Sequence, residues 1–191
     1  MEKEINKENQ ERKVKWITLR GLLALVIPIS GFITAYLLNN LVLLDYVHVM
    51  SGLLWTGIDI FMGFVLTFVL RSLDFKERAD VARGLTPTML FLMPSIASVA
   101  VTSGYFLSSE LGLFSLTSPL IISSGIIIVI LTIQGFGIFL PNNVRVLIEL
   151  NKDKPNYGKI SKLMMINFRL SGIQGILQLI LVFIMAHLAI L

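Results

Sequence analysis

Five long apolar segments alternate with shorter polar segments along the chain. Each apolar segment is long enough to cross the hydrocarbon core of a bilayer, which takes about 20 residues of helix. A spanning helix also satisfies its own backbone hydrogen bonds, as hydrocarbon requires. The pattern therefore predicts an all-α integral membrane bundle of five transmembrane helices, with spans at 21–38, 46–70, 85–107, 119–140 and 164–191.

The polar segments predict how the rest of the chain is divided. Residues 1–16 carry many charges of both signs, which is typical of a charged cytoplasmic tail. Residues 17–191 predict a single five-helix transmembrane domain. Within it, we expect the charged loop 71–84 to be helical in part, and 141–162 to be a second polar loop.

The composition supports a membrane protein and excludes several function classes. Only 15% of the residues are charged and 55% are hydrophobic, whereas soluble domains are about one quarter charged. The chain has no cysteine, which excludes disulfides, iron–sulfur clusters, thiolate zinc sites and c-type haem attachment. There is also no Ser-His-Asp arrangement, phosphate-binding glycine loop or HExxH motif, so soluble-type hydrolase chemistry has no support.

The basic residues predict the orientation of the bundle. The 16 Lys and Arg residues fall in three segments: the tail with Arg20, the 71–84 loop, and 141–169. The turns at 39–46 and 108–118 have none. By the positive-inside rule the N-terminus is cytoplasmic and the C-terminus lies outside. We expect a multi-pass protein of the cell membrane whose partner is the lipid bilayer, and the net charge of +4 predicts no nucleic-acid partner.

The second span carries polar and aromatic residues that a plain membrane anchor would not need. At about 100° per residue, His48, Trp55, Asp59 and Met62 fall within roughly 60° of one another around the helix. Hydrocarbon cannot satisfy such a stripe, so it must face protein, cofactor or water. We take this stripe as the candidate functional surface.

Asp59 lies near the middle of the membrane, about 16 Å deeper than His48. A carboxylate there is costly unless it is neutral, paired or hydrated. One interpretation is a proton or polar relay, or a carboxylate that bonds a cofactor. The other is a neutral Asp59 that hydrogen-bonds the amide of Gln134, Gln174 or Gln178.

His48 and His187 are the only two histidines, and both are expected in the outer half of the bilayer. Two histidines on different helices can ligate a haem b iron from both faces, or a copper ion. Met50 and Met185 would add soft ligands for copper. The alternative is that each histidine is only an interfacial residue. His187 also lies roughly opposite Gln178 around the fifth span, so the two cannot face the same neighbouring helix.

Four glycines late in the chain favour close packing of helices. They form two pairs, at 135 and 137 and at 172 and 175.

The stretch HVMSGLLWTG contains His48, then Trp55 seven residues later, then Gly57. It resembles the H-x6-W-x-G signature of the copper resistance protein D-like membrane proteins, and the related H-x6-W-x2-G pattern of the HemJ-type protoporphyrinogen oxidases. The resemblance implies that His48 is a haem ligand. The other haem ligand of the HemJ type is a lysine on a later helix, but spans three and four contain no Lys or Arg. His187 would have to take that place.

These observations predict a membrane-embedded haem b-binding protein in electron transfer or redox metabolism. The cofactor site would contain His48, His187 and Trp55. Such a protein would be a component of a haem-dependent oxidoreductase, with a membrane redox partner or a second copy of the chain. One alternative is a copper-handling transport protein of the copper resistance D type. Another is a non-catalytic subunit of a larger membrane complex.

Overall fold

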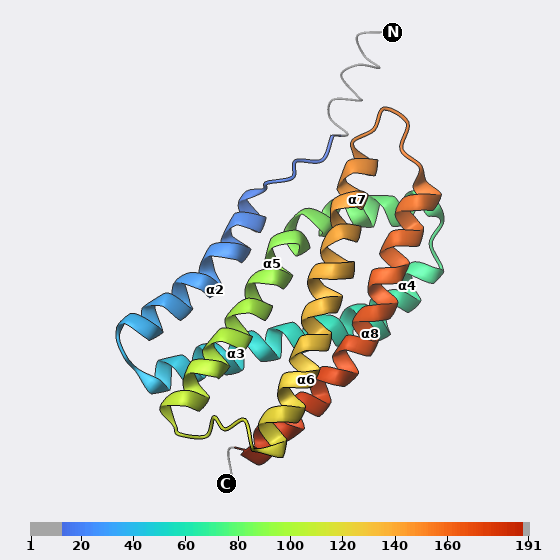
Figure 1. Ribbon diagram of the computed structural model, residues 1–191. Helices are drawn as coiled ribbons and strands as arrows, with labels where there is room; N and C mark the ends of the chain where they lie inside the picture. The colour runs from blue at the N-terminus through green and yellow to red at the C-terminus, as the bar shows by residue number, and fades with distance from the viewer. Residues whose placement is uncertain (1–12, 189–191) are drawn as a thin grey trace.

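The computed structural model describes residues 13–188 (Figure 1). In this range all regular structure is helical, and five helices are long and apolar enough to cross a membrane. The predicted five-span all-α bundle is therefore confirmed. Most of the predicted tail, residues 1–12, and the last residues, 189–191, lie outside the described part of the chain. The elements are α2 (Leu19–Leu37), α3 (Leu41–Ile60), the π-helix η1 (Phe61–Leu66), α4 (Thr67–Arg71), α5 (Phe75–Glu110), α6 (Pro119–Gln134), the π-helix η2 (Gly135–Phe139), α7 (Leu140–Leu150) and α8 (Tyr157–Leu188).

Two of the five spans are composite helices. The second span is α3, η1 and α4 in continuous succession, and the fourth is α6, η2 and α7. The second span lies obliquely in the bundle, and α3 packs against α2, α5 and α8 (Figure 1). It thus presents its polar stripe to other helices rather than to lipid.

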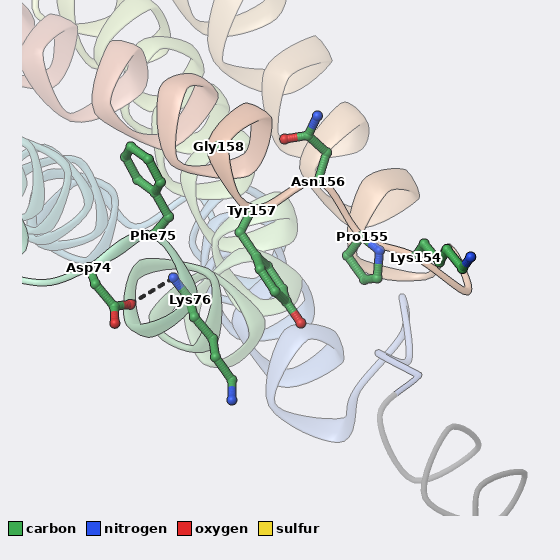
Figure 2. Close-up of a pocket in the computed structure, with 8 residues that line it drawn as sticks. All are labelled: Asp74, Phe75, Lys76, Lys154, Pro155, Asn156, Tyr157 and Gly158. Carbon is green, nitrogen blue, oxygen red and sulfur yellow. Dashed lines mark hydrogen bonds between the residues drawn. The ribbon is translucent and has the colours of Figure 1, made fainter.

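Helices extend further than the sequence pattern predicts at one end of the bundle. The start of α5 is fixed by Asp74, whose carboxylate accepts the backbone N–H of Lys76 at 2.8 Å (Figure 2). It also accepts the backbone N–H of Glu77 at 2.8 Å, and the Glu77 carboxylate accepts the backbone N–H of Asp74. This reciprocal capping box explains why much of the 71–84 loop is helical. The prediction that 141–162 is a loop is wrong, because only 151–156 is non-helical. Pro141 directly follows the π-helix η2 and the first residue of α7, and the helix continues through it.

Within residues 13–188, the three segments that contain Lys and Arg converge at one end of the bundle, which we call the basic end. Asn151 bonds both the backbone N–H and the carbonyl of Val14, at 2.8 and 3.1 Å. A shallow surface hollow lies between the starts of α5 and α8 and is lined by Lys76, Lys154 and Tyr157 (Figure 2). This arrangement places the described basic residues on one side of the bundle, as the sequence predicts. The assignment of that side to the cytoplasm stays a prediction.

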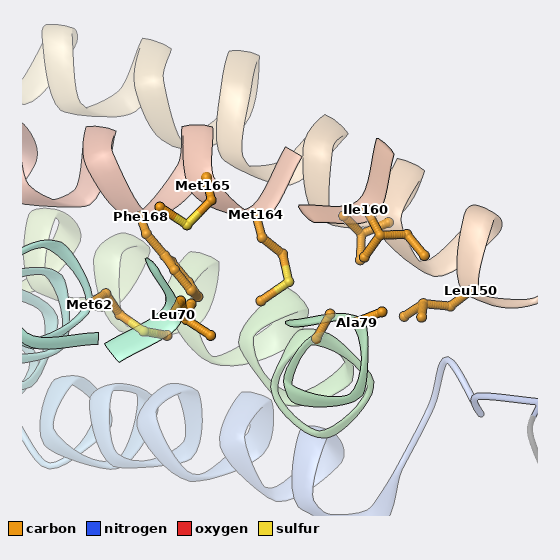
Figure 3. Close-up of a cluster of buried hydrophobic side chains, with 10 residues drawn as sticks. Met62, Leu70, Ala79, Leu150, Ile160, Met164, Met165 and Phe168 are labelled. Atoms are coloured by element: carbon orange, nitrogen blue, oxygen red, sulfur yellow. The ribbon is translucent and has the colours of Figure 1, made fainter. Parts of the chain in front are cut away.

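Two apolar clusters hold the bundle together. The larger lies toward the basic end and includes Met62, Leu70, Met164 and Phe168 (Figure 3). The smaller consists of Trp55, Ile96, Ala100 and Leu131 from three different spans.

Glycine contacts bring the second and fifth spans together. A Cβ added to Gly63 would overlap the backbone of Gly172, and one added to Gly175 would lie 2.9 Å from the Ile60 side chain. Close packing is thus confirmed for residues 172 and 175. The prediction of close packing is wrong for Gly135, which has open space around it, and for Gly137, which meets only a side chain of its own helix.

Glu149 organises the loop between α7 and α8. It is 3% exposed, and its carboxylate accepts the Nζ groups of Lys152 at 2.9 Å and Lys159 at 2.8 Å. Replacing Glu149 by glutamine should lower the stability of this end by about 1.5–3 kcal/mol, since a hydrogen bond to a charged group contributes about that much. Thermal melting in detergent and the protease sensitivity of the loop would measure the loss. Asp153→Asn, at an exposed acid of the same loop, is the control. Equal melting temperatures for Glu149→Gln and Asp153→Asn would contradict the stabilising role of Glu149.

Candidate functional site

Asp59 lies at the centre of the bundle and is fully buried, with 0% exposure. Its Oδ2 accepts a hydrogen bond from Nε2 of Gln178 at 3.0 Å, so α3 and α8 are joined by polar side chains. Ser171 and Trp55 are the other polar neighbours of this carboxyl group. Of the three glutamines predicted as partners, the structure therefore selects Gln178.

Several buried side-chain oxygens of the second, fourth and fifth spans have no hydrogen-bond partner. Oδ1 of Asp59 and Oε1 of Gln134, Gln174 and Gln178 are buried and have no hydrogen-bond partner. Gln174 and Gln178 are one turn apart on the same face of α8, and both are at most 2% exposed. Asn142 bonds Asn167 across α7 and α8. Gln134 lies eight residues before Asn142 and Gln174 lies seven residues after Asn167 on the antiparallel helix, so the two glutamines lie at similar depth.

A π-helix adjoins the site on each of the two composite spans. η1 begins two residues after Asp59, and η2 directly follows Gln134. π-Helical turns are rare and are frequently found at functional sites. The sequence pattern predicts neither π-helix.

Further polar side chains continue from this site toward the basic end. On α8 the buried residues Gln178, Gln174, Ser171 and Asn167 follow one another at steps of three or four residues, so they share a face. We call these four residues the polar column. Asn167 bonds Asn142 at 2.9 Å and Asn143 at 3.0 Å. The sequence pattern does not predict these asparagines as site residues, because it indicates a loop at 141–162.

His48 is held by backbone of the third span. Its Nδ1 lies 2.8 Å from the carbonyl oxygen of Ala100, with Ser103 Oγ at 3.5 Å. A carbonyl only accepts, so Nδ1 carries the hydrogen and, in the neutral ring, Nε2 carries the lone pair. The ring packs against Gly104, where an added Cβ would be 2.6 Å from His48 Cε1.

The other predicted ligands lie apart from this arrangement. His187 is exposed on α8, on the side opposite Gln178, as the helical spacing predicts. Met50 is 39% exposed and Met185 is half-buried. Within 13–188, no group of three or more His, Asp or Glu side chains could hold a metal ion. No hydrogen bond links His48 to His187 there, so their pairing stays a prediction.

Trp55 is 6% exposed and belongs to the apolar cluster with Ile96, Ala100 and Leu131. It lies between the level of His48 and that of Asp59. The stripe predicted on the second span is thus buried at Trp55 and Asp59 and half-buried at His48.

Comparisons with protein-family models, with characterised proteins and with solved structures found no match for this chain.

Proposed function

We propose that the protein binds haem b in the membrane and serves in electron transfer or redox metabolism, with His48 as an axial ligand. The observation that carries the proposal is the hydrogen bond from His48 Nδ1 to the Ala100 carbonyl at 2.8 Å. Histidines that bind metals almost always donate their other ring N–H in this way, because the bond fixes the tautomer and the ring orientation. Nε2 is then the nitrogen available to iron.

The donor set fits a haem with one ligand from this chain. An imidazole nitrogen suits haem iron, and the Ala100 carbonyl together with Gly104 gives the ring a defined position. His187 faces away from the helix that His48 occupies, so we give it no role as second ligand within the same chain. When bound, a haem accepts and donates single electrons, and the residues here would hold it in the half of the bundle away from the basic end.

Replacing His48 by alanine should abolish haem binding, since the one ligand to iron that this chain supplies is lost. The measurement is the visible spectrum of protein purified in detergent from cells supplied with haem. His187→Ala is the matched control because it removes the other histidine, which is exposed, and it should leave the spectrum unchanged. A wild-type spectrum in the His48→Ala protein would contradict the proposal.

Metal analysis of the same samples tests the alternatives. Copper in place of haem, lost on replacing His48, would favour the copper-handling function predicted from the sequence. Protein with neither haem nor copper would favour the non-catalytic subunit.

A further inference from the structure

We infer that Asp59 is a proton-binding site in the middle of the membrane, loaded from the basic end along the polar column. The reaction is simple: the Asp59 carboxylate binds one proton at Oδ1 to become a neutral carboxylic acid, and releases it again. This function is independent of haem and goes beyond the function proposed above.

The unpaired carboxylate oxygen Oδ1 is the first argument. Four buried oxygens, on Asp59, Gln134, Gln174 and Gln178, have no donor. An unpaired buried acceptor costs about 1–3 kcal/mol, and more when it is charged. A proton on Oδ1 turns that atom from an unpaired acceptor into a donor and offers a hydrogen bond to a neighbouring amide oxygen. It also removes the negative charge from hydrocarbon surroundings, where a charge is costly.

The surroundings of Asp59 provide no counter-charge. Its polar neighbours are Ser171 and Gln178 from α8 and Trp55 from its own helix, all of them uncharged. Among residues 13–188, none of the charged side chains on α5, α6 or α8 forms an ion pair with it. Neutralisation of this carboxylate therefore has to come from a mobile cation.

The Gln178 amide favours a proton over a metal cation. Its Nε2 donates to Oδ2 at 3.0 Å, which places amide hydrogens, with their partial positive charge, beside the carboxylate. A sodium ion needs oxygens turned toward it from several sides. A carboxylic acid suits the observed geometry, because Oδ2 goes on accepting while Oδ1 donates.

On one side of the site the polar column runs toward the basic end alongside the larger apolar cluster, whereas the smaller apolar cluster lies on the other side. Toward the basic end, Ser171 and Asn167 lead to Asn143, which is half-buried. Toward the opposite end, Trp55, Ile96 and Leu131 form an apolar cluster. Side-chain hydroxyls and amides with intervening water can pass protons, whereas a packed apolar cluster excludes water. The arrangement therefore favours loading and unloading from one side.

Infrared spectroscopy of the reconstituted protein tests this directly. We expect wild-type protein to show the carbonyl stretch of a buried protonated carboxyl group, with an intensity that changes with pH. Asp59→Asn, nearly isosteric and uncharged, should lose this band, while Asp45→Asn, at an exposed acid on the same helix, should keep it. Thermal melting should show both variants folded. The same band in wild type and Asp59→Asn would overturn the inference.

Two further measurements test the identity of the cation and the route. If adding sodium chloride at constant pH removes the band, while choline chloride does not, the site binds a metal cation and the inference is wrong. The rate at which the band shifts in D2O reports access. Asn167→Leu should slow that exchange, and Ser124→Ala, at a buried serine outside the polar column, should not. Unchanged exchange in Asn167→Leu would refute loading along the polar column.

Discussion

Replacing Gly63 by alanine should destabilise the bundle more than any other single methyl addition on the second span. The new Cβ would overlap the backbone of Gly172, and backbone cannot move aside as a flexible side chain can. Overpacking of this kind costs about 1–3 kcal/mol and occasionally more. We expect about 3 kcal/mol, or a fall of roughly 10 °C in the melting temperature in detergent.

Two glycine variants serve as controls for this prediction. Gly57→Ala lies on the same span with open space around it, so its stability should be unchanged or slightly raised. Gly172→Ala approaches the same contact from the other side, where its Cβ would be 3.4 Å from Gly63 Cα, so it should cost less. Equal melting temperatures for Gly63→Ala and Gly57→Ala would show that the two spans do not pack at Gly63.

Replacing Gly104 by alanine should impair cofactor binding although residue 104 is not a ligand. The new Cβ would lie 2.6 Å from His48 Cε1 and 3.0 Å from Nδ1, so the ring has to leave its place and lose its bond to Ala100. Loss of such a supporting bond typically lowers metal affinity by about 10–100-fold. A haem titration followed by visible absorbance would measure the change.

Gly52→Ala is the matched control for the cofactor experiment. It lies one turn from His48 on α3, and an added Cβ there meets nothing within 4 Å. Its haem affinity should equal that of the wild type. If Gly104→Ala binds haem as tightly as Gly52→Ala, then the position of the His48 ring against α5 does not matter for the cofactor, and the proposed function loses its main support.

The two proposed sites share one helix but differ in their surroundings. His48 bonds a backbone carbonyl of α5, and Asp59 bonds a side chain of α8. Trp55 lies between them in an apolar cluster. A redox centre and a proton-binding carboxyl group separated in this way would act independently. The haem titration therefore tests only the cofactor site, and the infrared experiment tests only Asp59.

The sequence by itself determined the five spans, because the requirement is local: a helix must be apolar over the thickness of the hydrocarbon and satisfy its own backbone. It also determined that His187 and Gln178 lie on opposite sides of one helix, since helical spacing alone decides that. The polar stripe of the second span had to be covered by protein, cofactor or water, and the burial of Asp59 and Trp55 confirms protein.

Only the tertiary structure decided which groups meet. The choice of Gln178 over Gln134 and Gln174 depends on how α3 and α8 are aligned, and three similar amides leave no difference for a sequence pattern to detect. The partner of His48 is a backbone carbonyl, which every residue possesses. The π-helices and the continuous helix through Pro141 likewise have no local signal strong enough to predict them, because packing against neighbouring helices selects among backbone forms of similar energy.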